Sequence, residues 1–331
     1  MQRRHFLQAA GSAAAVLGAP RALAQAQPNL PNLPSGPIRL IVGFPAGGGA
    51  DALGRVVAEK LTTLWKTQVI VENKAGASST LAAEFVAQQP ADGSTLLLST
   101  INSHALAPAV QPRLRYHPER DFTPVALLGV TPNLLITASN QPVKSLAEVV
   151  ALCKAKPGQV AFGSAGPGTI QHFAIEMFRL QAGVDPLHVP YKGSAPLLTD
   201  LIGGQIQFTF ETMTAATPHL KNGRVVALAQ TRAKRSKAYP GVATMQEQGY
   251  PEFETMNWYG LSGPARMAPA LVKRINDDVN AVLAMADVDA KLDTFGVEDG
   301  GGSAERYAQF THNEIAKWAR VAKDAKVSID S

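Results

Sequence analysis

The chain has 331 residues, of which 46% are hydrophobic and 17% charged, and a formal net charge of +5. This length is sufficient for a large core and predicts two domains, while the composition excludes a mainly disordered chain. The single cysteine, Cys153, excludes an internal disulfide and is expected to be a small core residue, not a nucleophile.

The first 24 residues predict an export signal. Arg3 and Arg4 precede an apolar, alanine-rich run over residues 9–17, and a small-x-small cleavage site ends at Ala24. The paired arginines favour the twin-arginine route over an ordinary secretory signal, which stays the alternative. Residues 25–37, rich in Pro, Asn and Gln, are expected to form a tether between the cleavage site and the fold.

Removal of this signal weakens the case for a nucleic-acid partner. The formal net charge falls from +5 to +2, because 28 basic and 26 acidic residues remain. The basic cluster over residues 232–237 is therefore expected to be a solvated loop. No later stretch reaches about 18 uninterrupted apolar residues, so the mature protein is expected to be soluble.

A strand, a glycine loop and a helix open the predicted fold. Residues 38–42 predict a buried strand, and residues 51–65 predict an amphipathic helix. Three successive glycines between them let the backbone approach a ligand, and the N–H groups of the first helical turn favour an anion. Asp51 is expected to cap this turn and to pair with Arg55, which leaves the anion to backbone amides and water.

A polar cluster follows the third predicted strand. Short apolar strands alternate with helices over residues 38–98, which predicts parallel β-α-β units. The carboxyl ends of such strands line a ligand crevice, so residues 99–104 (STINSH) are expected to face the same space as the glycine loop. His104 within this cluster is expected to be a structural histidine.

Two apolar runs, at 125–130 and 134–137, are predicted to be strands that cross between the domains. The segment between them (TPN, 131–133) contains a proline and predicts a break. A return crossing is expected at 258–262, and the helices over residues 268–323 are expected to pack on the first domain.

A second strand, glycine loop and helix follow this crossing. The loop at 163–169 lies between a strand at 160–162 and a helix at 170–182. Two amide-lined sites facing each other across a cleft would suit a ligand with a carboxylate at each end. Glu211 ends a later strand and is expected either to bind an ammonium or hydroxyl group of a ligand or to complement a helix N-terminus.

Motifs for catalysis are absent from the sequence. It has no GK[ST] phosphate loop, HExxH or CxxC, and residues 163–166 (GSAG) miss the GxSxG elbow because the serine stands one position early. The chain is therefore not expected to be an enzyme or to bind a metal or a cofactor. An exported hydrolase that uses Ser103 or Ser164 with a histidine stays the alternative.

Motifs along the whole mature chain also carry a family resemblance. They are residues 41–48 (IVGFPAGG) with Asp51 and Arg55, 121–126 (DFTPVA), 163–166 (GSAG) with Gly168 and Thr169, 189–193 (VPYKG), 201–205 (LIGGQ) and 258–261 (WYGL). With these motifs the chain resembles the solute-binding receptors of the tripartite tricarboxylate transporter family, also called TctC or Bug receptors.

The resemblance implies a periplasmic receptor with a two-domain, type II-like Venus-flytrap α/β fold, in which each lobe has a mainly parallel sheet flanked by helices. It implies capture of a small organic anion for membrane subunits of the tripartite type, by a monomeric protein; a receptor for a signalling system stays a further alternative. The predicted lobes are residues 38–128 plus 256–331, and residues 129–255.

The resemblance also implies the ligand-binding residues. One ligand carboxylate is expected to be bound through backbone and water by the loop over residues 44–51, with contributions from the opposite lobe and from the segment after the third strand. The predicted set is Phe44, Ala46, Gly47, Gly48, Gly49, Ala50, Asp51, Thr100, Ser103, Ser164, Ala165, Gly166, Thr169 and Glu211. Family members often have an aspartate where Glu211 stands, where it can select an amino or amide group, so the ligand type stays open.

Overall fold

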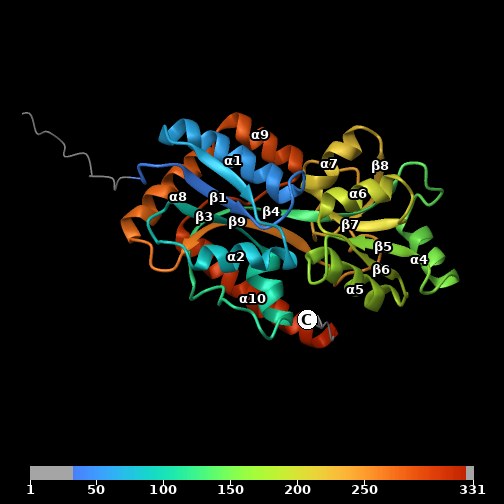
Figure 1. Ribbon diagram of the computed structural model, residues 1–331. Helices are drawn as coiled ribbons and strands as arrows, with labels where there is room; N and C mark the ends of the chain where they lie inside the picture. Colours follow the sequence, from blue (N-terminus) through green and yellow to red (C-terminus); the bar gives the residue numbers. More distant parts are fainter. Residues whose placement is uncertain (1–32, 326–331) are drawn as a thin grey trace, which may run out of the picture. The chain divides into compact units, whose positions relative to one another are not determined.

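The computed structural model describes residues 33–325, so the predicted signal and most of the predicted tether lie outside the described residues. The first strands pair in parallel, as their alternation with helices predicted, and β1 lies between β2 and β3. Helices α1 and α2 pack on opposite faces of these strands (Figure 1). The bounds are β1 (Ile38–Val42), α1 (Gly49–Trp65), β2 (Val69–Asn73), the turn η1 (Ala77–Ser79), α2 (Thr80–Ala87) and β3 (Thr95–Thr100).

The polar segment after β3 is helical. A π-type turn, η2 (Asn102–Leu106), continues into α3 (Ala107–Val110), and all residues of η2 are buried. This places most of the segment against the core, whereas its polarity predicted a crevice lining, a prediction that holds for Asn102.

One long strand, β4 (Phe122–Ala138), connects the two halves of the sheet. It pairs antiparallel with β9 (Met256–Pro264) as far as Pro132, and with β7 (Phe208–Thr212) and β8 (Val225–Gln230) from Asn133 or Leu134 onward. The predicted break at residues 131–133 is therefore wrong. The strand exchanges its partners at Pro132, where a missing N–H is tolerated, and it continues without interruption.

A second parallel group confirms the second predicted series. β5 pairs with β6 and with β7, and the whole sheet runs β2-β1-β3-β9-β4-β7-β5-β6 with β8 beside β4. Since the pairings of β4 and β9 are antiparallel, the sheet is mixed. The bounds in this half are α4 (Leu146–Ala155), β5 (Ala161–Ser164), α5 (Ile170–Ala182), β6 (Leu187–Pro190), α6 (Ser194–Ile202) and α7 (Met213–Lys221).

The C-terminal helices complete the core around β1 and β9. Helices α8 (Pro269–Leu283) and α9 (Ala286–Phe295) contribute apolar side chains to the cluster that contains β1 and α1. Helix α10 (Ala304–Ala325) packs Trp318 against Phe173 of α5, with ring centroids 5.5 Å apart, so it contacts both halves. Cys153 is fully buried, as expected of a small core residue.

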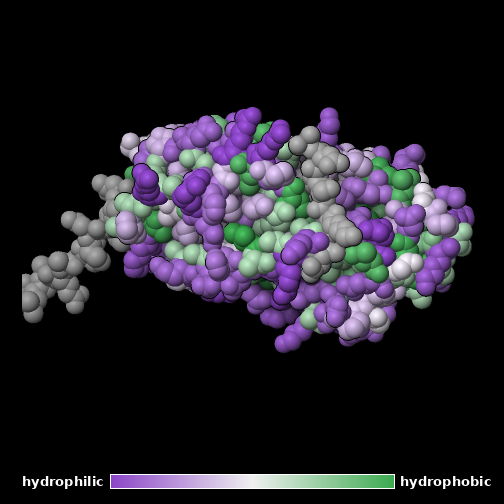
Figure 2. Space-filling model, turned by 90° about the horizontal axis from the view of Figure 1, so that it is seen from below, coloured by the Kyte–Doolittle hydropathy of each residue, from purple (hydrophilic) through white to green (hydrophobic). Residues whose placement is uncertain are grey.

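Hydrophilic residues cover most of the face shown in Figure 2, with hydrophobic residues in small areas between them. Among residues 33–325, no helix combines the length and the apolar character needed to cross a membrane.

Candidate functional site

The first glycine loop is fixed by Asp51, which lies in the first turn of α1. Its Oδ2 accepts hydrogen bonds from Gly47 N (3.0 Å) and Arg55 Nε (3.0 Å), and its Oδ1 accepts from Arg55 Nη2 (2.9 Å) and Asn73 Nδ2 (2.9 Å). The predicted pair with Arg55 is confirmed, but the predicted cap is wrong, because the N-cap residue is Gly48. Burial acts to raise the pKa of Asp51, and the hydrogen bonds outweigh it and lower that pKa.

A small chamber of about 20 Å³ lies at the N-terminus of α1. The residues that line it come from the first turns of α1, α5 and α6, from the start of α7, and from the loop and strand ends around them. They are Phe44, Pro45, Gly48, Gly49, Ala50, Asn102, Ala165, Gln171, Ser194, Thr212, Asn257 and Tyr259. Helix N-termini carry partial positive charge, so their convergence favours an anion.

Two of these four helices lack a side-chain cap. In the described part of the chain, Gly48 of α1 and Gly193 of α6 supply no capping hydrogen bond. By contrast, Thr169 accepts from His172 N at the start of α5, and Thr212 accepts from Ala215 N at the start of α7. Gly49 and Ala50 of α1 and Ser194 of α6 carry the first N–H groups of these helices and line the chamber, and the N-cap glycines supply no side-chain acceptor within the described residues.

Glu211 lies directly behind the chamber wall and is fully buried. Its Oε1 accepts from Thr212 N (2.6 Å), Ser194 Oγ (3.0 Å) and Gln171 Nε2 (3.1 Å), and these three donors all belong to chamber residues. Its Oε2 has no hydrogen-bond partner among residues 33–325, and the same holds for Gln171 Oε1 and Tyr259 OH. Burial raises the pKa of the Glu211 carboxyl, against the smaller opposite effect of these hydrogen bonds.

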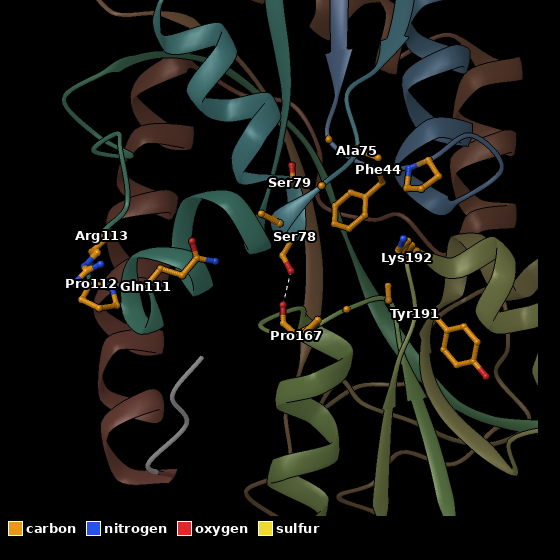
Figure 3. Close-up of a pocket in the computed structure, with 17 residues that line it drawn as sticks. Phe44, Ala75, Ser78, Ser79, Gln111, Pro112, Arg113, Pro167, Tyr191 and Lys192 are labelled. Carbon is orange, nitrogen blue, oxygen red and sulfur yellow. Dashed lines mark hydrogen bonds between the residues drawn. The ribbon is translucent and has the colours of Figure 1, made fainter. Parts of the chain in front are cut away.

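A larger cavity of about 680 Å³ adjoins the chamber, since Phe44, Pro45 and Ala165 line both. Its other lining residues are Gly43, Ala75, Gly76, Ala77, Ser78, Ser79, Gln111, Pro112, Arg113, Gly166, Pro167, Tyr191, Lys192 and Gly193. Figure 3 shows Phe44 and Lys192 on one side of this cavity and Arg113 on the other. The lining is mainly apolar, with Arg113 and Lys192 as its cations, and suits an organic anion with an apolar body.

A strained turn, η1, closes one side of the cavity. Ala77, Ser78 and Ser79 have φ of 44°, 56° and 76°, in the left-handed region that is costly for residues other than glycine. Ser78 Oγ donates to the carbonyl oxygen of Pro167 in the second glycine loop, as Figure 3 shows. This hydrogen bond connects η1 to the second glycine loop.

Ten of the fourteen predicted ligand-binding residues fall into two groups; Thr100, Ser103, Ser164 and Glu211 lie in neither. Phe44, Gly48, Gly49, Ala50, Ala165 and Gly166 line the chamber or the cavity. Ala46, Gly47 and Asp51 belong to the supported loop, and Thr169 caps α5. Ligand contact by any of these residues stays a prediction.

The two candidate nucleophiles face structural partners. Ser103 Oγ donates to Thr100 O (3.2 Å) and lies 3.0 Å from His104 Nδ1. Both side chains are buried among residues of the core, and Thr100 Oγ1 has no partner among the described residues.

The side chain of Ser164 contacts both a histidine and the backbone of the second glycine loop. Its Oγ lies 2.6 Å from His188 Nε2 and accepts from Gly166 N. His188 stacks on His172 with centroids 4.2 Å apart and planes 7° from parallel, and burial lowers the pKa of His188 to about 4. The stacked imidazoles support the loop, and His172 Nδ1 accepts from Gly168 N (3.1 Å).

Several lining residues were missing from the predicted set. Those of η1 and of residues 111–113 carry no distinctive motif. Tyr191, Lys192 and Gly193 belong to the VPYKG motif, which could have indicated them. Asn102 belongs to the polar cluster that was predicted to face the glycine loop, Tyr259 belongs to the WYGL motif, and Asn257 carries no distinctive motif.

Comparison with known proteins shows relatives that share this architecture. A family model described as "Tripartite tricarboxylate transporter family receptor" matches residues 53–327. A solved R. palustris protein with adipate is 34% identical, with a TM-score of 0.86 over 89% of this chain and 99% of that one. The periplasmic binding protein BugD is 29% identical (TM-score 0.85, 89% and 99%). MatC from Rhodopseudomonas palustris with bound malate is 30% identical (TM-score 0.82, 87% and 99%).

These matches span nearly all of each solved relative. They also show a two-domain α/β fold of the periplasmic binding protein type, although the lobe boundaries at residues 128 and 255 stay a prediction. The family consists of solute-binding receptors and not of enzymes. The chain therefore belongs to the tripartite tricarboxylate transporter family of periplasmic solute-binding receptors.

Proposed function

We propose that this receptor captures a small carboxylate-containing molecule between its lobes and delivers it to membrane subunits of the tripartite tricarboxylate type. The uncapped N-termini of α1 and α6 at one chamber carry this proposal. A ligand carboxylate there would accept hydrogen bonds from N–H groups that nothing else in the described chain caps, with favourable dipoles behind them.

The rest of the ligand would occupy the cavity of about 680 Å³. Its apolar lining favours an aliphatic or aromatic body, and Lys192 and Arg113 offer positions for a second carboxylate. Relatives solved with adipate and with malate support a carboxylate ligand for this chain. Closure would bring Ser78 and Pro167 together, which is the contact that the structure contains.

The ligand class can be tested by thermal shift on protein exported with its own signal and purified from the periplasm. The panel contains adipate, malate, benzoate, aspartate and a neutral sugar. We expect stabilisation by at least one carboxylate, because a ligand that binds only the folded state raises the melting temperature. Stabilisation by the sugar alone would contradict the proposal.

The location of the site can be tested with two glycine variants. A Cβ on Gly48 would meet nothing closer than 3.7 Å, so Gly48→Ala should fold normally but place a methyl group in the chamber. Gly241 has nothing within 4 Å of an added Cβ and lines neither site, so Gly241→Ala is the matched control. We expect weaker carboxylate binding only in Gly48→Ala, measured by calorimetry.

Delivery to a transporter needs a separate experiment. We expect a strain without this receptor to lose uptake of the radiolabelled carboxylate, and a plasmid copy to restore it. Unchanged uptake together with a lost transcriptional response would indicate a receptor for a signalling system instead. Light scattering of the purified receptor checks the proposed monomer.

A further inference from the structure

A buried carboxyl group lies behind the wall of the chamber that favours an anion. Glu211 is 0% exposed, and the three donors to its Oε1 come from residues that themselves line the chamber. Its Oε2 has no hydrogen-bond partner in the described part of the chain. One oxygen thus accepts three hydrogen bonds, and the other has no donor among residues 33–325.

An ionised Glu211 would conflict with a bound carboxylate. Two carboxylates that share a buried site cannot both keep their charge cheaply, because little solvent screens their repulsion. No cation among the described residues faces Glu211 or the chamber. On α1, Asp51 and Arg55 pair with each other. The residues that face Glu211 or the chamber from the other elements are Gln171 on α5, Ser194 on α6, Leu134 on β4, Thr212 on β7 and Tyr259 on β9.

We propose that Glu211 is the neutral acid whenever a ligand carboxylate occupies the chamber, so that the two carboxyl groups share one proton. The inference rests on the proposed function, because it requires a carboxylate ligand. The protonation state of Glu211 then sets the pH range in which the receptor binds its ligand. The proton comes from solvent, and no covalent bond to carbon changes.

Burial also raises the pKa of Glu211 in the free protein, which favours the neutral acid before the ligand arrives. Above that pKa, binding must take up a proton, so the dissociation constant rises by up to about tenfold per pH unit. The ligand itself loses its charge near about pH 4. Affinity is therefore expected to be greatest between these two values.

The test is isothermal titration calorimetry of each panel carboxylate between about pH 5.5 and 8.5, in buffers of different ionisation enthalpy. The wild type should take up close to one proton at each pH above the pKa of Glu211 in the free protein. Glu211→Gln keeps the shape of the neutral acid and should bind more tightly than the wild type there, without proton uptake. Asp277→Asn, which changes an exposed carboxylate paired with Lys273, should behave like the wild type.

Each other outcome overturns the inference in a recognisable way. Wild-type binding without proton uptake, together with tighter binding by Glu211→Gln at the same pH, refutes it, because Glu211 then stays ionised beside the ligand; the proposed function is left intact. Loss of binding by a normally melting Glu211→Gln at every pH shows an ionised Glu211 that binds a cationic group. If no panel carboxylate binds at any pH, the proposed function fails and this inference fails with it.

Discussion

Replacement of Asp51 by alanine should destabilise the protein by about 2 kcal/mol, and replacement of its partner Arg55 should cost much less. Asp51 is 4% exposed and accepts four hydrogen bonds, from Arg55, Gly47 and Asn73. The Arg55 side chain is 54% exposed, so its pair contributes about 0.5 kcal/mol. The bonds from Gly47 N and Asn73, which are only partly buried, contribute about 0.7 kcal/mol each.

The assay is urea unfolding of ligand-free Asp51→Ala, Arg55→Ala and the double variant. We expect the free energy of unfolding to fall by about 2 kcal/mol, about 0.5 kcal/mol and about 2 kcal/mol respectively. The double variant resembles Asp51→Ala because Arg55 has little effect once its partner is gone. Asp277→Ala removes another i,i+4 helix pair, one without loop contacts, and is the matched control. An Arg55→Ala cost equal to that of Asp51→Ala would refute the reasoning, since the ion pair and not the loop would then carry the energy.

The contribution of Asp51 to stability should also be measurable as its loss at low pH. The pKa of Asp51 lies below its usual value, so its stabilisation is present above about pH 4 and is lost as the pH falls through the lowered pKa. The Asp51→Ala protein should therefore lose less stability than the wild type below about pH 4.

Three further expectations concern the second loop, the closure contact and export. The folded pKa of His188 is lowered to about 4, so the wild type should lose stability as the pH falls from about 6.5 through about 4, and His188→Gln should lose less in melting curves across this range. Ser78→Ala removes the hydrogen bond to Pro167 and should weaken ligand binding several-fold in calorimetry while leaving the ligand-free melting temperature nearly unchanged. Replacement of Arg3 and Arg4 by lysine should retain the protein in the cytoplasm, shown by fractionation, if the twin-arginine route is used; continued export would indicate an ordinary secretory signal.

Helices with strong end signals were predictable from the sequence. Helix α5 spans residues 170–182 as predicted, because Thr169 caps its start and Gly183 ends it in the left-handed region. Helix α4 starts after Ser145, whose Oγ accepts from Glu148 N (3.3 Å), although the Glu148 carboxylate accepts from Lys144 N and not from the N-cap residue. Such helix ends are determined by residues close to them in the sequence, so they can be predicted from the sequence.

Features that depend on distant partners were not predictable in the same way. The continuity of β4 through Pro132 depends on the first residue of β9, Met256, and the last residue of β7, Thr212, lying opposite this point. Helix α7 contains Pro218 and two threonines, so its sequence does not favour a helix. The left-handed turn at residues 77–79 contains no glycine, and only its surroundings can impose that conformation.

The choice of N-cap residue connects the fold to the site. Helices that only need a stable start can use a side-chain cap, as α5 and α7 do with threonine. Glycine at the same position in α1 and α6 costs a few tenths of a kcal/mol and leaves the first N–H groups open. A ligand carboxylate would then serve as the missing cap of both helices at once, which couples their approach to ligand capture. If so, Gly48→Ser, which supplies its own hydroxyl cap, should raise the ligand-free melting temperature and lower carboxylate affinity together.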